Sequence, residues 1–206
     1  MEFFAPVKKG EGELTEKRSR FIGRVFPASS EEEAKAAISR VKTLHRDARH
    51  NPWCYLLPSG EGKSSDDGEP SGTSGTPMLE MIKRENIRGI VIVVTRYFGG
   101  VLLGPGGLAR AYTAAAKLAV EDAEIALFVT KTRVVTVAPY ALAAKIKYEI
   151  GAHGGDEERA DYVENVTVAA LFDEAAAQSF RESIIEITAG AVVPEISGEK
   201  LVPAAK

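Results

Sequence analysis

The spacing of apolar and polar residues divides the first part of the chain into short strands and helices. Residues 13–27 alternate in the way that a hairpin or a pair of strands does. Ser29 and Ser30 precede three acids, which predicts a helix start and a helix continuing to Leu44. The other elements expected here are strands at Trp53–Leu57 and Ile90–Thr95, a loop at Pro58–Thr76, and helices at Thr76–Asn86 and Leu108–Val120.

A different order of elements begins near residue 131. The pattern predicts a strand at Arg133–Val137, a helix at Ala141–Ile150, strands at about Glu158–Tyr162 and Val166–Leu171, a helix at Asp173–Thr188 and a strand near Ala191–Ile196. The order βαββαβ is that of a ferredoxin-like sandwich. We therefore expect an α+β protein with domains at 1–130 and 131–206.

Composition predicts a globular protein of the cytoplasm. Hydrophobic residues make up 45% and charged residues 27% of the 206 positions, which is enough apolar material for a sizeable core. No run approaches the roughly 18 apolar residues of a membrane span, and the N-terminus lacks the features of a secretory signal. Cys54 is the single cysteine, so no intramolecular disulfide can form.

Charge is distributed unevenly along the chain. Residues 1–130 contain 18 Lys and Arg against 17 Asp and Glu, whereas residues 131–206 contain 8 against 12. Positions 86–120 hold no acid, but they include Arg88, Arg96, Arg110 and Lys117. Such a segment suits phosphate or another anion. A buried strand and helix would lack acids as well, so both interpretations stay open.

A glycine-rich turn at Gly99–Gly107 joins the predicted buried strand to the next helix. The amides and dipole of a helix N-terminus favour an anion, and two arginines could add charge and planar donors. The spacing is neither a Walker loop nor a dinucleotide fingerprint. Alternatively, the glycines only permit positive φ angles or close backbone approach. The candidate residues for binding an anion or nucleic acid are Arg96, Gly99, Gly100, Gly106, Gly107 and Arg110.

The loop before Thr76 carries three carboxylates, on Asp66, Asp67 and Glu69. Among many hydroxyl groups, they could hold a hard divalent cation beside a phosphate, or two of them could act as acid and base. The alternative is an ordinary turn, because Asp side chains readily bond the local backbone. Apart from this cation, no cofactor is expected.

The histidines and serines form only weak catalytic patterns. His45 and His50 lie near an aspartate and the cysteine, but their spacing matches no zinc signature, so no metal ligand is assigned. Ser71 or Ser74 could form a triad with His50 and Asp67, but neither serine has the sequence of a nucleophile elbow.

Four aromatic residues near the predicted strands could stack on bases or belong to the core; they are Trp53, Tyr55, Tyr97 and Phe98. The acidic second domain disfavours general nucleic-acid binding, because neutralising phosphates dominates such affinity. RNA binding is therefore expected only on the first domain.

Three blocks of sequence resemble the IMPACT/YigZ family in its bacterial, two-domain form. They are Ser65–Leu79, then Val93–Tyr112 with VVTRYFGG, LGPGGL and RAY, and more weakly His45–Asn51. Members often have a cysteine after the His-Asn pair, where this chain has Pro52. The resemblance makes Asp66, Asp67, Glu69, Ser71 and Thr73 signature-loop residues, with His50 and Tyr97 in support.

The resemblance implies a first domain like the second domain of a small-subunit ribosomal protein and domain IV of elongation factor G. It implies a ferredoxin-like second domain, in agreement with the βαββαβ order. Eukaryotic members are linked to translation control and carry an extra N-terminal partner-binding domain, which is not carried over to this chain.

Three functions follow as hypotheses. The first is a translation-associated regulatory protein that contacts the ribosome, RNA or a translation factor through the first domain. The second is an enzyme or sensor for a phosphorylated or nucleotide ligand at 66–76 and 99–107. The third is a protein-interaction module without nucleic-acid contact. The sequence favours a binding protein over an enzyme and identifies no catalytic residue.

Overall fold

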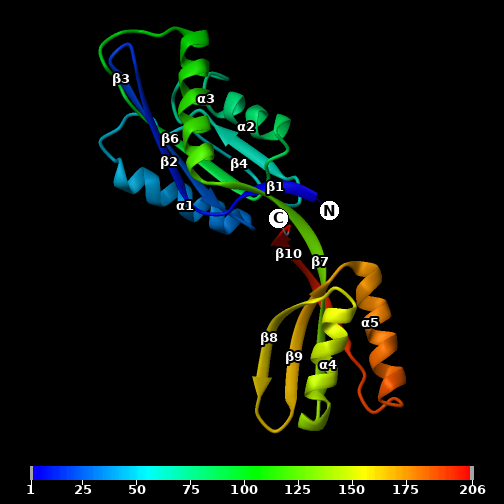
Figure 1. Cartoon of the computed structure of the whole chain (residues 1–206). Helices are drawn as coiled ribbons and strands as arrows, with labels where there is room; N and C mark the ends of the chain where they lie inside the picture. Colours follow the sequence, from blue (N-terminus) through cyan, green and yellow to red (C-terminus); the bar gives the residue numbers. More distant parts are fainter. Residues whose placement is uncertain (1, 205–206) are drawn as a thin grey trace. The chain divides into compact units, whose positions relative to one another are not determined.

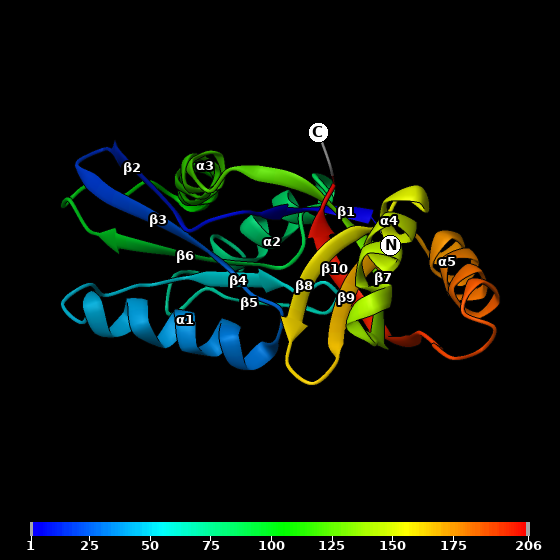
Figure 2. The ribbon, with the colours of Figure 1, turned by 60° about the horizontal axis from the view of Figure 1, so that its bottom comes forward.

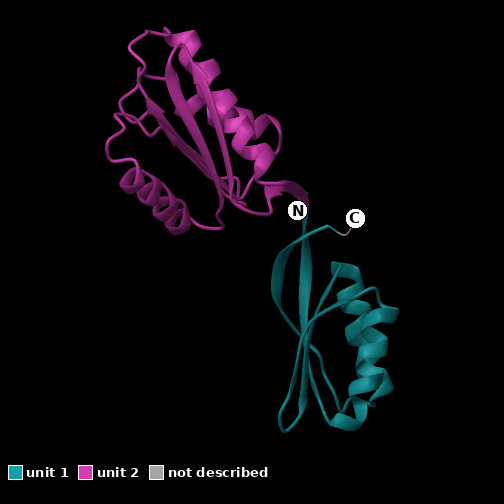
Figure 3. Cartoon of the chain, turned by 60° about the vertical axis from the view of Figure 1, so that its left-hand side comes forward, with its two compact units in different colours: residues 1–2, 128–206 teal, residues 3–127 magenta. Residues whose placement is uncertain are grey.

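The computed structural model describes residues 2–204, and the chain divides into two compact units (Figure 3). One is Phe3–Leu127, and the other is Phe128–Lys206 with Met1–Glu2. The division falls within a long strand, β7 (Ile125–Ala138), which begins in the first unit and continues into the second. The boundary expected from the sequence, after residue 130, lies in this same strand.

The first unit contains a five-stranded antiparallel sheet with the order β2-β3-β6-β4-β5 (Figure 1). A further strand, β1, pairs with β7. The elements are β1 (Glu2–Pro6), β2 (Gly10–Glu16), β3 (Ser19–Pro27), α1 (Glu31–Leu44), β4 (Trp53–Leu56), β5 (Gly62–Ser65), α2 (Gly75–Arg84), β6 (Ile90–Tyr97) and α3 (Pro105–Asp122).

Helices cover both faces of this sheet, with α1 on one side and α2 and α3 on the other (Figure 2). The central strand β6 shows the division most clearly. Ile90, Ile92 and Val94 join the core beneath α2 and α3, while Val91 and Val93 join the core beneath α1. Because both faces of β6 are buried, its sequence is a continuous β-branched run and does not alternate with polar residues.

Helix α1 begins where the sequence predicts, and side chains cap its first turn. Ser30 Oγ accepts a hydrogen bond from Glu33 N at 3.3 Å, and Glu33 Oε2 accepts one from Ser29 N at 2.7 Å. The first bond satisfies one of the amides that a helix start leaves without partners, and the second connects the residue before the N-cap to the first turn. This local chemistry lies entirely within five consecutive residues, which is why the sequence was sufficient to predict it.

Two expectations for the first unit need correction. The predicted loop at 58–76 contains β5, an edge strand that pairs with β4. Its Gly-Lys-Ser-Ser sequence has no apolar face, so the ladder to β4 alone identifies it. Helix α3 begins at Pro105, before the predicted start, because proline at the first helical position loses no intrahelical bond.

The second unit has the ferredoxin-like topology that the sequence predicts. Its antiparallel strand order is β10-β7-β9-β8, which is the order 4-1-3-2 along the βαββαβ chain. The final strand starts at residue 195 instead of 191. The α+β class is confirmed. The elements after β7 are α4 (Tyr140–Ala152), β8 (Asp156–Tyr162), β9 (Val166–Phe172), α5 (Glu174–Ile187) and β10 (Glu195–Pro203).

Within residues 2–204, no helix is both long and apolar enough to cross a membrane.

Candidate functional site

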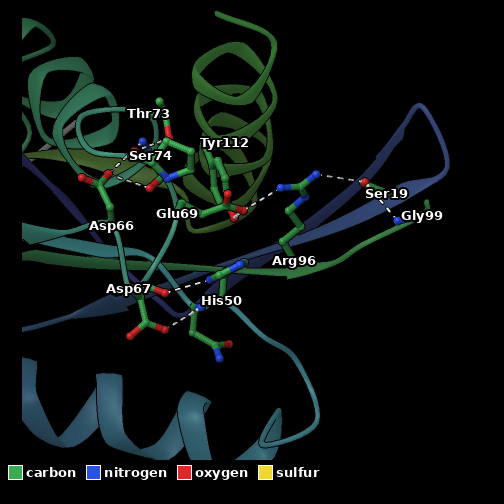
Figure 4. A network of polar contacts seen from close by, with 12 residues as sticks. Ser19, His50, Asp66, Asp67, Glu69, Thr73, Ser74, Arg96, Gly99 and Tyr112 are labelled. Atoms are coloured by element: carbon green, nitrogen blue, oxygen red, sulfur yellow. Dashed lines mark hydrogen bonds and ion pairs between the residues drawn. The ribbon is translucent and has the colours of Figure 1, made fainter. Parts of the chain in front are cut away.

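The acidic loop and the end of β6 meet in the interior of the first unit (Figure 4). Arg96 Nη1 lies 2.7 Å from Glu69 Oε1, and the two side chains are only 7% and 3% exposed. Tyr112, on α3, donates its hydroxyl hydrogen to the same carboxylate oxygen at 2.7 Å. Burial and the bond to Glu69 raise the pKa of Tyr112, so the phenol keeps its proton. Two glycine-rich motifs are thus joined by one buried carboxylate.

The rest of the Arg96 side chain is also enclosed. Its guanidinium lies over the rings of Phe21 and Phe98, at 5.5 and 5.4 Å from their centroids. Nη2 is 3.4 Å from Ser19 Oγ, a long contact, and that oxygen also accepts a bond from Gly99 N at 3.2 Å. Nε has no hydrogen-bond partner in the part of the chain that the structure describes. The charge of Arg96 is therefore balanced by Glu69 inside the fold, and its guanidinium does not reach an anion at the surface.

The burial of Arg96 could have been predicted from the register of β6. Arg96 has the same parity as Ile90, Ile92 and Val94, which all face the core beneath α2 and α3. A buried arginine requires a carboxylate partner. Glu69 lies 27 residues earlier, and nothing in the sequence distinguishes it from the neighbouring acids.

Asp66 holds the N-terminus of α2. Its Oδ1 accepts bonds from Ser74 Oγ (2.7 Å), Ser74 N (3.0 Å) and Gly75 N (2.9 Å), and its Oδ2 accepts one from Gly72 N (2.8 Å). Burial raises the pKa of this carboxyl, but the four donors outweigh burial and leave the pKa below its ordinary value. Asp66 therefore acts as the cap of α2 from outside the helix.

Asp67 connects the acidic loop to α1 and to the segment between α1 and β4. Its Oδ1 pairs with Lys42 Nζ at 2.5 Å, and its Oδ2 accepts a bond from Asn51 N at 2.8 Å. His50 Nδ1 donates to the Asp67 carbonyl at 2.9 Å. Asn51 in turn accepts a bond from Thr95 Oγ1 at 2.7 Å. The His-Asn pair of the weaker sequence block thus positions the acidic loop.

The three carboxylates of the loop have three different partners, so they do not converge on a common site for a divalent cation. Among residues 2–204, no group of three or more His, Cys, Asp or Glu side chains could hold a metal ion. The triad hypothesis lacks its geometry too, since Ser74 Oγ donates to Asp66. Ser71 is exposed, and Thr73 Oγ1 donates to the Pro70 carbonyl at 2.6 Å.

The glycine turn is shaped by close packing and by positive φ angles. A Cβ at Gly99 would lie 2.0 Å from the carbonyl carbon and oxygen of Arg18. The backbone of the turn therefore packs directly against the turn between β2 and β3. Gly100 has φ +84° and the N-cap Gly104 has φ +72°. Gly106 and Gly107 belong to the first turn of α3. The close packing at Gly99 and the positive φ angles at Gly100 and Gly104 give these three glycines a structural role whether or not an anion binds.

Basic and apolar side chains are exposed on the β2–β3 turn and on the β6–α3 turn and first turn of α3. We call these residues the tip surface; they are Lys17, Arg18, Phe98, Val101, Leu102 and Arg110. Lys17, Arg18 and Arg110 are exposed, and within residues 2–204 none of them has an ion-pair partner. Phe98 is 50% and Leu102 82% exposed. The β2–β3 turn and the β6–α3 turn lie at the same end of the unit (Figure 1). Of the expected binding residues, Arg110 is the arginine that reaches solvent.

A chain of hydrogen bonds that sequence reasoning missed involves Tyr97 and His45. Arg24 Nη1 lies 2.6 Å from His45 Nε2. Because an arginine can only donate, His45 Nε2 is the acceptor of this hydrogen bond. His45 Nδ1 therefore carries the proton and donates to the Tyr97 hydroxyl at 2.9 Å, which donates to Asp47 Oδ1 at 3.0 Å. Burial first, and the Arg24 charge second, lower the pKa of His45.

Cys54, near the position of the family cysteine, is fully buried in the core beneath α2 and α3. Burial raises the pKa of its thiol, so the thiolate that cysteine chemistry needs is disfavoured.

Comparison with known proteins agrees with this architecture. Residues 17–120 match the model of the Impact N-terminal domain, and residues 136–191 match a domain of unknown function, DUF1949. The IMPACT family member YvyE of Bacillus subtilis is 35% identical over 190 residues, covering 91% of this chain and 88% of YvyE. This chain belongs to the IMPACT family.

Other relatives of the IMPACT family match more locally. Escherichia coli YigZ is 44% identical over 100 residues, about half of each chain, at 47% and 49%. Protein IMPACT of Oryctolagus cuniculus is 30% identical over 112 residues, which are 51% of this chain and 34% of the rabbit protein. A crystal structure of a hypothetical protein superposes along the whole chain with a TM-score of 0.67 at 27% identity.

Proposed function

We propose that this chain is a cytoplasmic, translation-associated binding protein that contacts RNA, in particular ribosomal RNA, through the tip surface of its Phe3–Leu127 unit. The single observation that carries the proposal is the set of three exposed cations, Lys17, Arg18 and Arg110, without ion-pair partners in the described part of the chain. Membership of the IMPACT family supports the link to translation control.

The tip surface has the composition that RNA contact requires. Cations that are not neutralised by neighbouring carboxylates are available to displace counterions from phosphates. Phe98, half exposed beside them, can stack on an unpaired base. Arg96 has no part in this proposal, because its guanidinium is buried in an ion pair with Glu69. The proposed contact is therefore with the outer surface of the motif and not with its buried ion pair.

Co-sedimentation with ribosomes across a salt series tests the proposal. The variant Lys17→Ala/Arg18→Ala/Arg110→Ala should bind more weakly and flatten the dependence of log K on log salt by about two to three. The control Lys83→Ala/Arg84→Ala/Lys145→Ala removes the same charge from other exposed positions without ion-pair partners among residues 2–204. Failure of the wild type to bind at low salt, or equal weakening by both variants, would contradict the proposal.

A protein partner is the second candidate, and the apolar part of the tip surface favours it. Leu102 is 82% exposed, far more than its burial preference would lead one to expect, and Val101 is 38% exposed. An association that survives high salt and nuclease treatment, and that Leu102→Ser abolishes, would identify a protein-interaction module instead.

A further inference from the structure

A groove lies along α1 on the opposite face of the sheet from Tyr112 and Arg96. It has a volume of about 700 Å³ and is lined by residues of α1, β4 and β5 and by Arg46, which follows α1. Ligand pockets for small molecules generally measure about 300–1,000 Å³. Its lining does not include any residue of the tip surface or of the buried Glu69 network.

Two aromatic rings form the apolar wall of the groove. Trp53 and Tyr55 project from the same face of β4, and their rings are parallel within 3° with centroids 5.9 Å apart. Tyr55 is buried and donates its hydroxyl hydrogen to Glu31 Oε1 at 3.0 Å. Trp53 is only half-buried, so part of its indole remains available to a planar ligand.

Four cations surround this wall, with Lys35, Lys42 and Arg46 on the α1 side and Lys63 on β5. Glu31 is the single acid in the lining. Lys63 and Lys35 lie 2.7 and 3.2 Å from its Oε1. With Tyr55, they lower the pKa of Glu31 to about 2, so its charge is constant at neutral pH.

The cations are not all committed to carboxylates. Lys42 pairs with Asp67 outside the lining, and Lys63 also lies 3.5 Å from Glu61 Oε1. Arg46 is exposed and has no ion-pair partner within residues 2–204. Lining residues therefore leave a net positive charge beside an aromatic face. Arg46 offers the planar donor fork that suits a phosphate.

We propose that this groove binds a free nucleoside phosphate, with its base stacked on Trp53 and its phosphates held by Arg46. An acidic peptide would satisfy the cations, but its carboxylates bring no planar group for the indole, whereas a nucleotide carries both a base and phosphates in one small molecule. The combination of one accessible ring with a cluster of cations favours a nucleotide. This site is separate from the proposed RNA contact and does not depend on it.

The test uses the fact that Trp53 is the single tryptophan of the chain, so its fluorescence reports on the groove itself. ATP, GTP and AMP should quench Trp53 saturably, while adenosine or inorganic triphosphate alone should bind at least about tenfold more weakly. Free N-acetyltryptophanamide in the same titration corrects for absorption and collisional quenching. Absence of saturable quenching by any nucleotide at millimolar concentration would overturn the proposal.

Variants then assign the contacts. Arg46→Ala should weaken nucleotide binding about tenfold, whereas Arg49→Ala, exposed three residues further along and outside the lining, should leave it unchanged. Trp53→Ala, measured by calorimetry with circular dichroism as a folding check, should also bind more weakly. Equal affinity of wild type and a folded Arg46→Ala would contradict the assignment.

Two comparisons separate this site from the RNA contact. The tip variant should quench normally with nucleotide, and Arg46→Ala should retain the salt dependence of ribosome co-sedimentation. A six-nucleotide RNA that quenches Trp53 while no free nucleotide does would overturn the proposal in favour of strand binding in the groove.

Discussion

Glu69 and Arg96 form a buried ion pair, with 2.7 Å between Oε1 and Nη1, that connects the acidic loop to the central strand. The pair lies in the interior, at 3% and 7% exposure, and Tyr112 completes it from α3. Loop, sheet and helix therefore meet at one carboxylate. The two most distinctive motifs of the family are in this way parts of a single structural unit.

Removing one partner of this pair should be far more costly than removing both. Arg96→Met leaves the Glu69 carboxylate buried with only Tyr112, and we expect a loss of about 3–5 kcal/mol in the free energy of unfolding. Glu69→Leu/Arg96→Met should recover much of that loss. Urea denaturation of wild type, both single variants and the double variant gives the coupling. A loss below about 1 kcal/mol in Arg96→Met would show that the pair is not buried.

Asp66→Ala should destabilise the start of α2, because four donors lose their acceptor. The expected cost is about 2 kcal/mol. Asp66→Asn, which keeps one acceptor oxygen, should cost less. Since folding lowers the pKa of Asp66 below 3.8, its contribution is complete above that pH and is lost as the pH falls through the folded pKa. The difference between wild type and Asp66→Asn should therefore shrink in acid, as measured by urea denaturation.

Replacing either of two glycines of the same motif by alanine should change the stability of the protein, but in opposite directions. At Gly99 the new Cβ would lie 2.0 Å from backbone atoms of Arg18, so Gly99→Ala should cost about 1–3 kcal/mol. At Gly106, in the first turn of α3, the nearest atom is 3.6 Å away and belongs to the flexible Arg110 side chain. Gly106→Ala should therefore stabilise by about 0.4–1 kcal/mol. Thermal melting of the two variants and the wild type measures both changes. Equal shifts of Tm in the two variants would contradict the packing described for Gly99.

Stability should decline in mild acid through His45. Its pKa in the folded protein lies below the ordinary 6.5, so the unfolded chain binds more protons between the two values. The free energy of unfolding should then fall as the pH drops from 6.5 to the folded pKa, and no further below it.

The variant His45→Gln isolates this effect from His50 and His153. It should show a weaker decline than wild type between pH about 8 and about 5. In an NMR titration of the wild type, the His45 midpoint should lie below 6.5, and a midpoint above that value would refute the assigned proton positions.

The sequence by itself determined the elements whose causes are local. The cap of α1 is formed by Ser30 and Glu33, three residues apart, and the buried strand β6 is visible as an unbroken β-branched run. The order βαββαβ likewise specified the second unit, because its amphipathic periods and turns are encoded within each segment. The strand β5 escaped prediction, since its sequence has no apolar period and its strand conformation is visible only in the hydrogen bonds to β4.

Only the tertiary structure decided what the charged residues of the motifs do. Asp66, Asp67 and Glu69 are almost adjacent in sequence, and with Asp67 at φ +46° their carboxylates reach α2, Lys42 and Arg96 respectively. Residue type predicted ligands for an external cation or phosphate. Their partners come from distant segments, and a buried charge is stable only when such a partner reaches it. That pairing depends on how the segments pack, which the local pattern does not contain.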